Sequence, residues 1–131
     1  MTKSSSSPVS VKVKVIDFNV AVKLDDEAQI LGGTGLKEWS APETRLKLHT
    51  DYKIDCWTLG CIMIFLCTGN QPFKREDKIK MTPEFGLIDK MSDYREKKSF
   101  SDMVDFIGKL LINDPEKRLS AVEALAHPFL R

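Results

Sequence analysis

Asp17 is the residue in this sequence best suited to metal chemistry. It follows Val11 to Ile16, where apolar residues alternate with lysines, a pattern that predicts a strand with one buried face. Mg²⁺ takes carboxylate oxygens, and the end of a strand is a rigid place from which to offer one. Aspartate also forms turns between strands, and a second short strand is predicted at Val20–Val22. Asp17 is therefore either a metal ligand or a turn former.

Three cysteines are the other chemically capable residues, at positions 56, 61 and 67 of one apolar run. Their spacing does not place two thiols on one helix face, as a metal site would require. The odd count and the absence of a secretory signal favour reduced thiols in a cytoplasmic protein. We therefore expect these cysteines to be small buried core residues.

The composition fits one domain with a hydrophobic core, since the chain has 131 residues and 42% hydrophobic content. Its 20 Lys and Arg residues nearly cancel 19 Asp and Glu residues, leaving a net charge of +1. This balance argues against nucleic acid or an anionic membrane as the main partner. The apolar run from position 56 to 67 is shorter than the roughly 20 residues that cross a bilayer.

Most of the remaining pattern predicts helices. Residues 55–68 are apolar nearly all the way round, with Asp55 as the expected N-cap and Gly69 as the expected end. Ser101 is expected to cap an amphipathic helix, and Ser120 with Glu123 forms a capping box for the last one. Residues 1–10 are a Ser-rich loop or tail. The predicted fold class is mainly α, with a short β-hairpin at the N-terminus.

Several motifs follow one another in a familiar order. "DFN" ends the first strand, and "EWSAPE" (Glu38–Glu43), "DCWTLGC", "TGNQPF" and "DPEKRLSAVEALAHPFL" come after it. This series resembles the second half of a eukaryotic protein kinase domain of the serine/threonine type. The resemblance covers residues 11–131, which implies a partial kinase domain with a kinase-like C-lobe.

The resemblance implies a role for four residues. Asp17 would hold the Mg²⁺ that bridges the phosphates of ATP, although Asn19 stands where the family usually has glycine. Glu43 and Arg118 would form a buried ion pair that ties the activation segment to the last helices. In the family, the residue matching Asp55 also reaches the backbone of the catalytic loop.

Thr34 is the remaining candidate. It is the only hydroxyl residue between Val20 and Glu38, so it is the candidate phosphosite of the activation segment. It lies seven residues before Ala41, whereas the family's docking threonine lies five residues before that alanine. The match to the docking threonine is therefore imperfect.

The catalytic parts of a kinase are missing from the sequence. It contains no glycine-rich loop, no ATP-binding lysine and no catalytic loop with its base aspartate. We therefore expect this chain by itself to be inactive, and Met1 to be an internal methionine of a longer kinase. That parent would use ATP and Mg²⁺ to phosphorylate serine or threonine of a protein substrate. The alternative is a non-catalytic kinase-like binding module. In both cases another protein or segment would cover the apolar helix 55–68.

Overall fold

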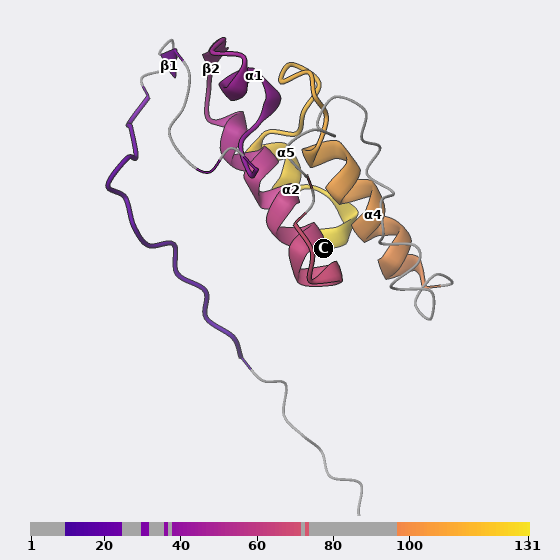
Figure 1. Ribbon diagram of the computed structural model, residues 1–131. Helices are drawn as coiled ribbons and strands as arrows, with labels where there is room; N and C mark the ends of the chain where they lie inside the picture. Colours follow the sequence, from indigo (N-terminus) through magenta and orange to yellow (C-terminus); the bar gives the residue numbers. More distant parts are fainter. Residues whose placement is uncertain (1–9, 25–29, 32–35, 37, 72, 74–96) are drawn as a thin grey trace, which may run out of the picture.

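The computed structural model describes residues 10–24, 30–31, 36, 38–71, 73 and 97–131 (Figure 1). The elements in chain order are β1 (Ile30–Leu31), α1 (Pro42–Arg45), β2 (His49–Thr50), α2 (Lys53–Thr68), α4 (Lys98–Leu110), α5 (Ala121–Leu125) and the 3-10 helix η2 (Pro128–Leu130). The two strands pair antiparallel, with Ile30 opposite Thr50 and Leu31 opposite His49. The described part is mainly helical, as the sequence predicts.

Helices α2 and α4 lie side by side and enclose most of the core (Figure 1). One cluster of buried residues joins α2 to α4 and to the segment before α1 (Ala41, Trp57, Cys61, Ile64, Phe73, Ile107 and Leu111). A second cluster brings α5 onto a neighbouring face of the same two helices (Cys56, Phe106, Leu110 and Ala124). The α2–α4 contact is close because Gly60 has no side chain. A Cβ there would lie 2.9 Å from Leu111 Cγ.

The ends of the helices show how local chemistry sets their bounds. Gly69 ends α2 with φ of 69°, and its N–H donates to the carbonyl of Phe65, which confirms the predicted C-cap. The capping box of Ser120 and Glu123 at the start of α5 is also confirmed. The predicted starts of the two long helices are wrong. Helix α4 begins at Lys98 rather than after Ser101.

Helix α2 begins at Lys53, so Asp55 lies inside its first turn and is not the N-cap. The N-cap position is Tyr52, whose side chain makes no capping hydrogen bond; Asp51 just before it accepts a hydrogen bond of 2.7 Å at Oδ1 from the backbone N–H of Lys53. Oδ1 of Asp51 thus satisfies one of the free N–H groups of the first turn. The capping acid was therefore predicted four residues too late in the chain: Asp51, and not Asp55, binds a backbone N–H at the start of α2.

The predicted β-hairpin at the N-terminus is absent from the described residues. Residues 10–24 are in no helix or strand and, apart from the half-buried Leu24, are exposed; among the described residues, a backbone hydrogen bond from Ala21 N–H to Phe18 O closes a turn in this segment. Figure 1 shows this indigo segment running away from the helices. A strand needs a neighbour for its backbone N–H and C=O groups, and no described residue pairs with this segment. The valines that alternate with lysines in this segment are therefore exposed and do not form a buried face.

One face of α2 is only partly covered by the described residues. Leu59, Ile62 and Leu66 follow Asp55 at helical spacing, and their exposed fractions are 43%, 42% and 75%. Phe65 beside them is 41% exposed. The sequence predicted that this helix would need cover on all sides. The structure shows which side the described residues leave open.

Candidate functional site around Arg118 and Glu43

The loop after α4 aims the side chain of Arg118 into the core. Asp114 starts the turn, since its Oδ1 accepts the N–H of Glu116 at 3.1 Å and its carbonyl accepts the N–H of Arg118 at 3.1 Å. This is the turn that an Asp-Pro sequence favours. On the opposite side Pro42 occupies the first turn of α1 and Glu43 follows it. Two short local structures thus present a cation and an anion to each other.

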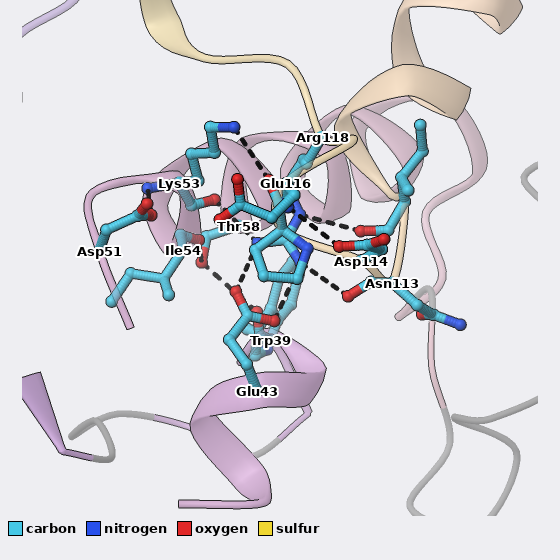
Figure 2. Close-up of polar contacts among 12 residues, drawn as sticks. Trp39, Glu43, Asp51, Lys53, Ile54, Thr58, Asn113, Asp114, Glu116 and Arg118 are labelled. Carbon is cyan, nitrogen blue, oxygen red and sulfur yellow. Dashed lines mark hydrogen bonds and ion pairs between the residues drawn. The ribbon is translucent and has the colours of Figure 1, made fainter. Parts of the chain in front are cut away.

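Glu43 and Arg118 form a two-pronged ion pair (Figure 2). Arg118 Nη1 donates to Glu43 Oε1 at 2.6 Å, and Nη2 donates to Glu43 Oε2 at 2.9 Å. The side chains are 0% and 4% exposed. Planar guanidinium and carboxylate groups match in this geometry, which makes the pair both strong and directional.

The other N–H groups of Arg118 are also satisfied. Nε donates to the carbonyl of Ile112 at 3.0 Å, Nη1 to that of Lys53 at 3.1 Å, and Nη2 to that of Asn113 at 3.3 Å. These three bonds and the two to Glu43 use all five N–H donors of a guanidinium. The guanidinium carbon also lies 5.1 Å from the ring centre of Trp57, so a cation–π contact adds to the site.

The start of α2 is bound into the same network (Figure 2). Lys53 Nζ donates to the carbonyl of Pro115 at 2.9 Å, while the carbonyl of Lys53 accepts from Arg118. Thr58, one turn further along α2, lies 3.4 Å from the carbonyl of Trp39. The site therefore joins α1, α2 and the loop after α4. Sequence reasoning missed Lys53 and Asp51, and their only signal was a charged pair just before an apolar helix.

This centre is built to hold elements together, because the described hydrogen bonds engage the charged groups of both Glu43 and Arg118. Every donor of Arg118 and both oxygens of Glu43 are used, so neither residue can bind a phosphate or move a proton without breaking the network. Burial of a charge is tolerated only while its partner is present. The arrangement supports a structural role for both residues.

Asp17 stands apart from this centre. It lies in the exposed segment 10–24, it does not end a strand, and its φ is 66°. Asp17 therefore has left-handed backbone, and Asn19 lies in the turn that follows. Within the described ranges no three His, Cys, Asp or Glu residues come together as a metal site. Because one exposed carboxylate is a weak ligand set, these residues by themselves do not fit Mg²⁺.

The remaining candidates are less informative. Thr34 lies outside the described residues. Asp55 is exposed on the open face of α2. Burial raises the pKa of the Cys56 and Cys67 thiols, which keeps them protonated and unreactive at neutral pH. The three cysteines form no disulfide in the described structure, and the described helices include none long and apolar enough to span a bilayer.

Comparison with known proteins places these features in context. The chain matches the protein kinase domain family over residues 4–130. It is 37% identical over 126 residues to the serine/threonine-protein kinase pakF of Dictyostelium discoideum, covering 91% of this chain and 10% of that protein. It is 32% identical over 147 residues to mitogen-activated protein kinase 14 of Xenopus laevis, covering 90% of this chain and 40% of that protein.

A solved structure gives the same picture. The fold is similar to that of the twitchin kinase region from C. elegans, with a TM-score of 0.70 and 31% sequence identity, over 90% of this chain and 21% of that chain. The prediction of a kinase-like fold is thus confirmed by this structural similarity. The chain spans at most 40% of the length of each of these relatives.

Proposed function

The chain belongs to the protein kinase family, and from that premise we propose that residues 11–131 are the C-terminal part of a serine/threonine kinase domain. Residues 1–10 are then a Ser-rich loop within that domain. The complete enzyme transfers the γ-phosphate of ATP to serine or threonine of a protein substrate. The relative pakF, whose name specifies a serine/threonine kinase, supports this choice.

The observation that carries the proposal is the Glu43–Arg118 pair. Two hydrogen bonds join Glu43 of the "APE" segment to Arg118 in the loop before the last helices, a third joins that loop to Lys53 of α2, and both charged side chains are buried. A buried pair of this kind costs desolvation, so it fits a chain in which the position of the segment before α1 matters. In a kinase that segment leads to the substrate.

The proposal assigns Asp17 one part of the catalytic site. Its carboxylate would offer Mg²⁺ one ligand in the complete domain. The ATP-binding lysine, the base aspartate and the remaining ligands are not in these 131 residues, so they would come from other sequence of the parent protein. The chain in isolation is then inactive.

The first experiment maps the 5′ end of the native transcript and the N-terminus of the protein it yields. We expect coding sequence upstream that includes a glycine-rich loop and a catalytic loop. The native protein should then phosphorylate serine or threonine, Asp17→Asn should remove this activity, and the exposed Glu116→Gln should not. A native protein that begins at Met1, or full activity in the Asp17→Asn variant, would refute the proposal.

A non-catalytic binding module is the second candidate, and the open apolar face of α2 favours it. A partner protein would cover Leu59, Ile62 and Leu66. Magnesium separates the two candidates, because a binding module needs neither Mg²⁺ nor nucleotide. Partner binding by the native protein that persists in EDTA, together with no transfer of phosphate, would favour this second function.

A further inference from the structure

The last turn of the described chain is held to α4 through His127. The side chain of His127 is 5% exposed. Its Nε2 lies 2.9 Å from Asp105 Oδ2 on α4, and its Nδ1 accepts the backbone N–H of Phe129 at 3.2 Å. Both ring nitrogens are therefore engaged at once, one by a helix and the other by the turn η2.

These partners determine the tautomer of the ring. A backbone N–H can only donate, so the nitrogen facing Phe129 must be the unprotonated one. The proton of neutral His127 is then on Nε2, where it donates to the carboxylate of Asp105. The Nδ1 lone pair serves as the cap of η2.

Aromatic packing depends on the same contact. The His127 ring lies 5.0 Å from the ring of Phe106, and Phe129 lies 5.4 Å from that ring. Phe106 is 1% exposed and belongs to the core cluster shared by α2, α4 and α5. The bond from Phe129 N–H to Nδ1 thus holds the side chain of Phe129 on an edge of the core.

Among the described residues, Asp105 is the charged group that contacts the His127 ring. Asp105 also pairs with Lys109 at 2.7 Å and is 53% exposed. The hydrogen bond from Lys109, and less strongly that from His127, holds the pKa of Asp105 below its ordinary value. On α5 the carboxylate of Glu123 is bound to Ser120 at the far end of its helix. Residues 128–130 carry no charge, and Arg131 follows them.

We propose that His127 is a pH-sensitive clasp that releases η2 from α4 when Nδ1 gains a proton. The proton comes from solvent, and the ring then has two donors and no acceptor. The N–H of Phe129 loses its partner and faces a second N–H. Protonation strengthens the ion pair between the ring and Asp105 only slightly, because that carboxylate is half exposed and already paired with Lys109. The ring stays on Asp105 while η2 and Phe129 move off.

Nuclear magnetic resonance of the 131-residue chain tests the clasp. The ring signals of His127 and the exchange protection factor of the Phe129 amide are followed from about pH 7.5 to about pH 5. We expect the proton on Nε2 at the upper pH, and at least a roughly tenfold loss of Phe129 protection in step with ring protonation. A proton found on Nδ1, a ring that does not titrate, or protection that survives ring protonation would each overturn the proposal.

Two variants sharpen the result. In His127→Asn the side-chain oxygen can still cap η2 as an acceptor but does not titrate, so Phe129 should stay protected across the range. Asp105→Asn should keep the pH response, because the acceptor at Nδ1 is unchanged. A His127→Asn chain that loses protection at the same pH as the unchanged chain would assign the effect to another group and refute the clasp.

Discussion

Replacing Glu43 by Gln tests the central network most directly. The substitution keeps the shape of the side chain, but it removes the negative charge and turns an amide donor toward the donors of Arg118. Arg118 has no exposed side-chain surface, so its charge would be left buried without a counter-ion. Such a loss costs about 3–5 kcal/mol. Because domains are stable by roughly 5–15 kcal/mol, most of the stability is at risk.

Urea unfolding followed by tryptophan fluorescence measures this effect. Trp57 lies 5.1 Å from the guanidinium of Arg118, so its emission reports on the altered site. Glu116→Gln is the matched control, since Glu116 is exposed. We expect the control to change the free energy of unfolding by less than about 0.5 kcal/mol. A cost below about 1 kcal/mol for Glu43→Gln would refute the reasoning about the buried charge.

A double replacement, Glu43→Leu with Arg118→Met, separates the ion pair from the backbone bonds. Removing both charges often restores stability at a buried pair. Here it should not, because the carbonyls of Ile112, Lys53 and Asn113 would lose their donors, at about 1–3 kcal/mol for each one left buried and unpaired. A double variant as stable as the unchanged chain would show that these three bonds contribute little.

Three further predictions concern the helices and the carboxylates. Gly60→Ala should lower the free energy of unfolding in urea by about 1–2 kcal/mol, because the new Cβ would lie 2.9 Å from Leu111 Cγ. The gain in helix propensity from alanine is smaller than this cost. A more stable variant would contradict the prediction. Lys47 has a φ of 55° just after α1, a backbone conformation that favours glycine. Lys47→Gly should therefore raise the free energy of unfolding by about 0.5–1 kcal/mol and raise the melting temperature. An unchanged or lower melting temperature would argue against strain at this position. Hydrogen bonds hold three carboxyl pKa values below their ordinary values (Asp105, Asp114 and Glu123). Their contribution to the free energy of unfolding is present above about pH 4 and is lost as the pH falls through the lowered pKa values. The urea concentration at the midpoint of unfolding should therefore decrease when the pH is taken below about 4, and an increase would contradict this.

Some features of the fold follow from neighbours in the sequence. The capping box at Ser120 and the end of α2 at Gly69 were both predicted, because a cap depends on hydrogen bonds across only three or four residues. The starts of α2 and α4 were misplaced, since several polar residues in a row can serve as caps and packing selects among them.

The N-terminal strands show the limit of a repeating pattern. Alternation of Val and Lys indicates how a strand would bury one face, but a strand forms only where a partner supplies the backbone hydrogen bonds. In the described residues no such partner is present for 10–24. Asp17, the candidate ligand, is exposed for the same reason.

The sequence by itself determined the family, the mainly helical fold and the pairing of Glu43 with Arg118, because these depend on residue types in a recurring order. Only the tertiary structure decided that Arg118 also binds three carbonyls, that His127 bridges α4 and η2, and which face of α2 is open. Glu43 and Arg118 are 75 positions apart, so no local spacing encodes their geometry. A helix that is apolar all round has no preferred side, and its orientation follows from what packs against it.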